Sequence, residues 1–328
     1  MKRALLFISW LFLIIFLSNG FGQTFKKYAG EFMELGTAPR AQAMGGAAVA
    51  SVSDITASYY NPAALFQINQ TQISFMHTQQ LIASVNYDYL GIARRHGDKR
   101  VWALSMVRLG IDNIKDSRQA QIYFQNDPDN WRIDWNKVTS FNAADYIISL
   151  SAAQQWKTNV LVGATVKYIR RDLAEFSANG FGFDAGLLYQ AKKNWNLGAH
   201  FRNITTTLIS WSTGEKELVS PSIALGTAYR FRLPTLNSGF QFAGDTYLRT
   251  EGREESAQVN LGFLSFDFAA GIEYDYAGTL FFRAGIDELE RLNLGTGFRI
   301  PHLKIDYAFT SYDDELGNSH RIGLIVLL

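Results

Sequence analysis

The five histidines are the first residues to consider for catalysis or metal binding, and their spacing supports neither. They stand far apart, with no HExxH pair and no acidic residue at metal-ligand spacing. They are His77, His96, His200, His302 and His320. The Ser319-His320 pair stands where a strand is expected to begin, which favours a turn over a nucleophile beside its base. No metal site is expected.

Three glycines superficially suggest a phosphate-binding loop. Gly180, Gly182 and Gly186 do not have the GxGxxG spacing, and they fall within an expected strand instead of before a helix. The nucleophile motif GxSxG does not occur either. The sequence therefore predicts a protein that is not an enzyme and that binds no cofactor.

Charged residues on the expected inward faces of strands carry more information. Ionisable groups at membrane depth need partners or water, and opposite charges on neighbouring strands can pair. The candidates are Arg283 with Glu273 or Asp275, Arg291 and Arg299 beside the strand of Lys304 and Asp306, Asp184 with His200 or Arg202, and the N-terminal Glu31, Glu34, Arg40 and Asp54. The alternative is a solvated lumen. If the strands form a barrel, both interpretations argue against an apolar tunnel through all of it, which a route for fatty acids would need at least in part. They favour partner binding instead.

The elements that position these charges are strands. In 160–170 the side chains Val160, Val162, Val166 and Tyr168 share one face, and small or polar residues share the other. Segments of about ten alternating residues are typical of membrane strands. Fourteen are expected, at 71–78, 85–95, 100–110, 145–156, 159–171, 180–191, 195–204, 220–231, 237–249, 266–276, 278–287, 291–300, 302–311 and 320–328. A soluble β-sandwich is the alternative.

Short and long connections alternate along the chain, as they do when successive turns emerge at opposite ends of a barrel. The expected long extracellular loops are 111–144, 205–219 and 250–265. The first is rich in aromatic residues, so it is either a lid on the barrel or a partner surface. The candidate partner residues are Tyr123, Phe124, Trp131 and Trp135 in this loop, and Trp211 in the second.

Residues 28–65 lack this alternation and are rich in Ala, Gly and Ser. We expect short helices here: Thr37 as a cap before Pro39, Asp54 as a second cap, and Asn61 before Pro62 at the start of a third. Helices with such small side chains fit a tight enclosure whose wall supplies the bulk. An Ala-rich helix pair in a soluble domain is the alternative.

The same residues resemble the opening of the PorV/PorQ family. The order is Phe32, Leu35-Gly36, Arg40-Ala41, Met44-Gly45-Gly46-Ala47, Asp54 and Tyr60-Asn61-Pro62-Ala63-Ala64-Leu65. These are outer-membrane proteins associated with type IX secretion, related in fold to the FadL-type fatty-acid transporters. The resemblance implies a 14-stranded barrel with an N-terminal hatch in its lumen. It also implies hatch-motif roles for Arg40, Gly45, Gly46, Asp54, Asn61, Pro62 and Ala63.

The first residues resemble a secretory leader. Lys2 and Arg3 precede an apolar run, and Gly20-Phe21-Gly22 offers small residues for cleavage. Removal of this leader takes two positive charges away, so the net charge changes from +1 to −1, which argues against a nucleic-acid partner. We expect a leader at 1–22, a hatch at 23–68 and a barrel at 69–328.

The expected fold is a 14-stranded antiparallel outer-membrane β-barrel with an N-terminal, partly helical hatch in the lumen. The resemblance favours a role in protein secretion or surface attachment of cargo, with membrane lipid and secretion proteins as partners. The alternative is a FadL-like transporter of long-chain fatty acids or other hydrophobic small molecules. A structural barrel with an unknown partner is a third possibility.

Overall fold

The computed structural model describes residues 30–80, 85–123, 131–250, 253, 257–312 and 317–328. The expected leader, residues 23–29 and Phe124 lie outside these ranges. Among the described residues no helix is long and apolar enough to cross a membrane.

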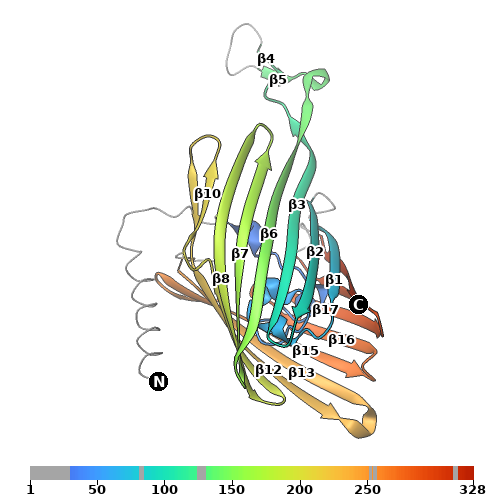
Figure 1. Ribbon diagram of the computed structural model, residues 1–328. Helices are drawn as coiled ribbons and strands as arrows, with labels where there is room; N and C mark the ends of the chain where they lie inside the picture. The colour runs from blue at the N-terminus through green and yellow to red at the C-terminus, as the bar shows by residue number, and fades with distance from the viewer. Residues whose placement is uncertain (1–29, 81–84, 124–130, 251–252, 254–256, 313–316) are drawn as a thin grey trace.

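The described strands close into a 14-stranded antiparallel β-barrel (Figure 1). Closure occurs at β1, where Phe75 is paired with Leu90 of β2 on one side and with Leu324 of β19 on the other. A closed sheet leaves no unpaired edge. The barrel strands are β1 (Gln72–Gln80), β2 (Val85–His96), β3 (Arg100–Asp116), β6 (Thr139–Lys157), β7 (Val160–Leu173), β8 (Phe176–Lys192), β9 (Trp195–Arg202), β12 (Ser222–Leu233), β13 (Ser238–Arg249), β15 (Leu264–Tyr276), β16 (Leu280–Ile286), β17 (Leu292–Ile300), β18 (Leu303–Thr310) and β19 (Ser319–Leu327).

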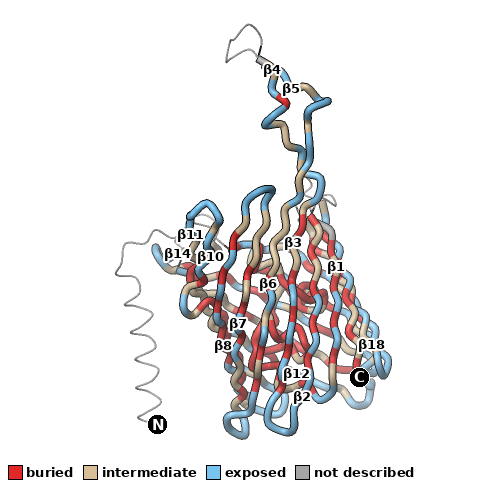
Figure 2. Tube along the Cα trace, turned by 45° about the horizontal axis from the view of Figure 1, so that its top comes forward, coloured by how far each residue is buried: buried red, intermediate tan, exposed pale blue. Residues whose placement is uncertain are grey.

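Side chains alternate between the two faces of the wall, as Figure 2 shows for burial along each strand. The outward face is a belt of exposed apolar side chains, including Phe75, Leu90, Leu104, Leu150, Phe183, Leu225, Phe242, Phe268 and Ile322. Outward aromatic residues gather where strands meet short turns: Trp102, Trp156, Trp195, Tyr229 and Tyr276. This belt with an aromatic girdle is the surface that a bilayer requires. The soluble alternatives are wrong.

The two ends of the barrel differ in their connections. One end, called here the short-turn end, has brief turns such as those at 97–99, 158–159 and 193–194. The opposite, long-loop end carries the additional elements β4 (Gln121–Tyr123), β5 (Trp131–Ile133), η4 (Trp135–Lys137), β10 (Thr207–Trp211), β11 (Lys216–Val219) and β14 (Val259–Leu261). The short helix η5 (Pro234–Leu236) lies in a short-turn connection.

Two strands extend past the boundaries expected for the first loop. β3 and β6 stay paired as far as Asp116 and Thr139, with a bulge between Ile111 and Ile114. Backbone pairing does not depend on an apolar face, so the ribbon continues where the side chains become polar. The loop expected at 111–144 is therefore largely a strand ribbon, with the β4–β5 hairpin beyond its end (Figure 1). The expected loops 205–219 and 250–265 likewise contain β10, β11 and β14.

Residues 30–68, called here the luminal segment, lie inside the ring of strands (Figure 1). Pro39 begins α2, and Asn61 caps η3 by accepting a hydrogen bond from the Ala63 N–H at 3.1 Å. Thr37 does not cap α2, because Ala38 occupies the cap position and makes no side-chain bond. Asp54 accepts from the Thr56 N–H two residues later, and Thr56 is the cap of α3. The helices are η2 (Glu31–Met33), α2 (Pro39–Ala43), α3 (Ala57–Tyr60) and η3 (Pro62–Gln67).

The wall has glycine wherever the luminal segment approaches it most closely. A Cβ at Gly186 would lie 2.8 Å from the Ala63 nitrogen, and one at Gly271 would lie 2.7 Å from the Met44 carbonyl carbon. Gly198 shows the same approach to Val49, at 2.6 Å from its carbonyl oxygen. Gly182, also on β8, does not make such an approach. That residue lies beside Thr207 and Lys167, because the stagger of the strands places it further toward the long-loop end.

Candidate functional site

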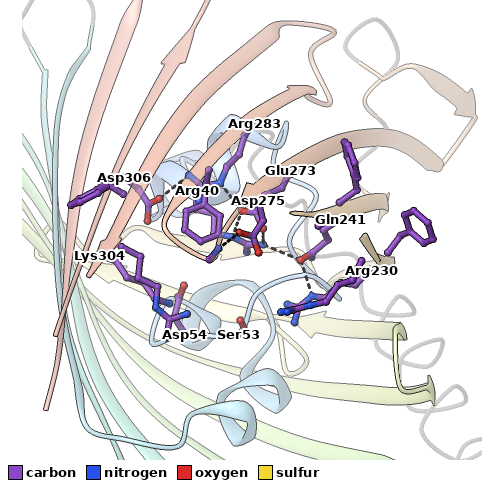
Figure 3. Close-up of a pocket in the computed structure, with 18 residues that line it drawn as sticks. Arg40, Ser53, Asp54, Arg230, Gln241, Glu273, Asp275, Arg283, Lys304 and Asp306 are labelled. Atoms are coloured by element: carbon purple, nitrogen blue, oxygen red, sulfur yellow. Dashed lines mark hydrogen bonds and ion pairs between the residues drawn. The ribbon is translucent and has the colours of Figure 1, made fainter. Parts of the chain in front are cut away.

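The lumen has a charged region beside strands β12 to β18 near the short-turn end, called here the charged half. Toward the long-loop end it has an apolar cluster with ion pairs beside it, called here the apolar half. The charged half contains a hollow of about 210 Å³ between the luminal segment and strands β12 to β18 (Figure 3). Its polar lining includes Arg40, Ser53, Asp54, Arg230, Gln241, Glu273, Asp275, Arg283, Lys304 and Asp306.

Arg40 joins the luminal segment to this wall. Its guanidinium donates to both Glu273 oxygens, from Nε at 2.8 Å and from Nη2 at 3.0 Å. Arg283 lies on the other side of the same carboxylate, at 2.6 Å, and also donates to Asp306 at 2.7 Å. Figure 3 shows this row of alternating charges. The pairing of Arg283 with Glu273 and of Arg40 with the wall is as the sequence predicted. Bidentate pairing of this kind is strong and directional.

Glu34 makes the corresponding connection in the other half. Its carboxylate accepts from Arg202 on β9 and lies 3.7 Å from Arg249 on β13. Arg249 also donates to Asp267 at 2.6 Å and to Glu288 at 2.7 Å. The luminal segment is thus held to the wall by ion pairs of Glu34 and Arg40, both in its N-terminal part.

Asp184 lies 3.8 Å from His200, as expected, and pairs more closely with Lys167, at 2.8 Å. The expected pairs of Arg291 and Arg299 differ from the prediction. Arg291 pairs with Asp287. Arg299 lies opposite Lys304, a like charge, because Asp306 is in register with Gly297.

The remaining hatch-motif residues hold the segment's backbone in place. Asn61 is fully buried and donates to the carbonyls of Val49 at 2.8 Å and Leu187 of β8 at 3.1 Å. Pro62 and Ala63 contact Gly163 and Gly186 of the wall. Gly45 and Gly46 both have positive φ, at 67° and 84°, and end the turn after α2. Asp54 lines the hollow and bonds locally to Thr56.

The apolar half was not predicted from the sequence. Phe32 and Met33 of the luminal segment are buried in a cluster of inward side chains from the wall. The wall residues are Met76, Tyr87, Tyr89, Val107, Ile147, Ile169, Ala178, Ile209 and Val219. A usable signal was present in β3, where the inward Val107 and Leu109 are apolar although the outward Met106 is apolar too. An inward apolar run in a membrane strand indicates an apolar lumen at that level.

The candidate partner residues do not form one surface. Trp131 and Trp135 are 49% and 75% exposed, on β5 and η4 beyond the barrel rim. Tyr123 lies on β4, paired with Trp131. Trp211 instead packs at the edge of the apolar cluster, with the Arg171 guanidinium 5.3 Å from its ring centroid. Trp211 therefore belongs to the lumen and not to a partner surface.

The ribbon below the hairpin is held by an exposed ion cluster. Arg118 donates to Asp116 at 2.8 Å and to Glu175 at 2.7 Å. These hydrogen bonds lower the pKa of Asp116 to about 2 and lower the pKa of Glu175 as well. Among the described residues no group of three His, Cys, Asp or Glu side chains is arranged to hold a metal ion.

Comparisons with known proteins find barrels of similar fold among solved structures. No protein-family model matches the chain, and no curated protein matches it. Solved structures do match. The Ralstonia pickettii toluene transporter TbuX has TM-score 0.56 at 13% identity, over 89% of this chain and 97% of that one. The CymD monoaromatic hydrocarbon channel has TM-score 0.55 at 14% identity, over 90% and 98%.

A third similar structure is a Pseudomonas aeruginosa FadL homologue, with TM-score 0.51 at 12% identity, over 88% of this chain and 96% of that one. At such identities the likeness concerns the fold. The chain has the fold of bacterial outer-membrane β-barrels of 14 strands, in agreement with the location expected from its sequence.

Proposed function

We propose that the chain is an outer-membrane transporter that admits hydrophobic small molecules from the long-loop end. The observation that carries this proposal is the apolar cluster around Phe32 and Met33. Inward apolar residues at membrane depth are unnecessary for a barrel that is only a scaffold, because a polar or solvated lumen is equally stable. An apolar compartment open to an entering solute is what a hydrophobic ligand requires.

The titles of similar structures point the same way. TbuX is described as a toluene transporter and CymD as a monoaromatic hydrocarbon channel. These descriptions belong to those proteins, and they make hydrophobic transport the stronger of our two hypotheses. The class of ligand, whether aromatic hydrocarbon or fatty acid, is a separate question.

In this arrangement Phe32 and Met33 occupy the space that a ligand would use. Transport therefore requires η2 to leave the apolar cluster. For this, Glu34 must break its ion pairs with Arg202 and Arg249.

Truncation of the two plugging side chains tests the proposal. The double variant Phe32→Ala/Met33→Ala should increase the uptake rate of a labelled hydrophobic solute in cells that express the protein. Phe66→Ala is the matched control, because Phe66 is an aromatic residue of the same segment outside the apolar cluster of Phe32 and stacks on Arg95 at 4.6 Å. Equal uptake by wild type, double variant and vector-only cells would contradict the proposal.

A second candidate function is the secretion or cargo-attachment role that the PorV/PorQ resemblance implies. One observation favours it: Trp131 and Trp135 are exposed on a hairpin that stands beyond the barrel rim (Figure 1). Tryptophan side chains often dominate protein interfaces. The solved structures named above bear on transport and not on secretion, so this role rests on the resemblance of residues 28–65 and on the hairpin.

A further inference from the structure

A second hollow, of about 280 Å³, adjoins the first at the short-turn end and has a different charge. Three cationic side chains line it, Arg230, Arg299 and Lys304, and no carboxylate does. Its other lining residues are Ser53, Gln67, Asn69, Gln70, Gln72 and Leu327. Ser53 and the three cations also line the first hollow, so the two share a wall. Figure 3 shows Lys304 and Arg230 on opposite sides, with Ser53 and Asp54 between them.

These cations differ from four buried arginines of the lumen. Arg40, Arg202, Arg249 and Arg283 each pair with a carboxylate. Within the part of the chain that the structure describes, the side chains of Arg299 and Lys304 make no ion pair or hydrogen bond, and Arg230 donates to the neutral amide of Gln241 at 2.9 Å. Three neighbouring cations therefore lack an acidic partner.

The acids nearby are already engaged. Glu273 is held by Arg40 and Arg283, and Asp306 by Arg283. Asp54 accepts from the Thr56 hydroxyl at 2.5 Å, and Asp275 accepts from the Gly278 N–H at 2.7 Å. Neither of these two lies within ion-pair distance of a described cation. None of these four carboxylates forms an ion pair with Arg230, Arg299 or Lys304.

The strand register places two of these cations directly opposite each other. Arg299 of β17 and Lys304 of β18 are direct cross-strand partners, and both line the same hollow. Like charges directly opposite on paired strands destabilise a sheet. An anion between them would turn this repulsion into two attractive contacts. The guanidinium fork and the ammonium group are the side chains that recognise phosphate and carboxylate oxygens.

We propose that Arg230, Arg299 and Lys304 form a binding site for a small oxyanion, a phosphate or a carboxylate, at the short-turn end. Ser53 and the surrounding amide side chains supply neutral hydrogen-bond donors. The volume accommodates several water-sized groups, enough for a phosphate and its hydration. An anion enters from the compartment at that end, without passing the luminal segment. The site is therefore independent of hydrophobic transport.

Titration calorimetry on the full-length protein in uncharged detergent, at low ionic strength, tests this site. The probes are inorganic phosphate and succinate, and binding of either one is expected for the wild type. Arg299→Gln and Lys304→Gln should each weaken it by about tenfold or more. Arg94→Gln, at the same end on β2 but outside both hollows, should bind as the wild type does. Saturable binding of neither probe, or unchanged binding by both cavity variants, would overturn the proposal.

Thermal unfolding provides a second readout that separates ligand binding from misfolding. Without phosphate, Lys304→Gln should melt at or above the wild-type temperature, because the variant loses a like-charge repulsion. Phosphate should raise the wild-type melting temperature and leave that of the variant unchanged. A wild type that phosphate does not stabilise, together with a variant that melts lower, would contradict the site.

Discussion

The Arg40 guanidinium donates two hydrogen bonds to the Glu273 carboxylate, of 2.8 and 3.0 Å, and thereby joins the luminal segment to strand β15. Both side chains are largely shielded from water. Arg283 holds the same carboxylate from the barrel wall. The segment is therefore fixed to the lumen by a shared buried charge as well as by close packing.

Removal of Arg40 should be strongly destabilising. Arg40→Met leaves Glu273 with one cation in place of two, and breaking a buried pair costs about 3–5 kcal/mol. Chemical unfolding in detergent or lipid vesicles measures the change. Glu175→Gln removes one partner of the exposed pair with Arg118 and is the control, with no measurable change expected. If Arg40→Met and Glu175→Gln have the same free energy of unfolding, the buried pair does not fix the segment.

Two adjacent glycines test how closely the segment meets the wall. Gly45 and Gly46 both have positive φ, so alanine is strained at either position. A Cβ at Gly45 would also lie 2.8 Å from the Ile286 nitrogen of β16, whereas one at Gly46 meets only the Tyr247 hydroxyl at 3.6 Å. Gly45→Ala should therefore lower the free energy of unfolding by about 1–3 kcal/mol more than Gly46→Ala. Equal losses would place Gly45 away from the wall.

The sequence predicted the strands well because period-2 alternation survives wherever a membrane strand has lipid on one side. It did not predict that Lys304 lies opposite Arg299, because that depends on strand register. Short turns do not specify the register to one residue. The position of Gly182 beside Thr207 likewise depends on the stagger of the strands. The apolar cluster around Phe32 was missed because Ile147, Ile169 and Ile209 are separated in sequence and come together only through the register of strands β6, β7, β8 and β10.

The closed sheet should resist unfolding by detergent. Unheated and boiled samples should migrate differently on a detergent gel, because a barrel without edges stays folded until heated. The protein should also fractionate with the outer membrane. Identical migration together with a soluble fraction would contradict the barrel.

The hairpin tryptophans separate the two candidate functions. Trp131→Ala/Trp135→Ala should leave gel migration unchanged, since both side chains are exposed. Under the transport proposal, uptake of a hydrophobic solute continues at the wild-type rate. A loss of co-purified protein partners with unchanged uptake would instead favour the secretion role.

The most direct measurement is the uptake of labelled toluene and labelled fatty acid by cells that express the wild type or Ile147→Asn/Ile169→Asn. Both isoleucines lie in the apolar cluster, and the control Ile148→Asn changes the neighbouring residue on the outward face. Gel migration verifies that each variant is assembled. We predict faster uptake of at least one solute by the wild type than by vector-only cells, and loss of that gain in the luminal variant but not in the control. Uptake at the vector-only rate by an assembled wild-type barrel, for both solutes, would contradict hydrophobic transport.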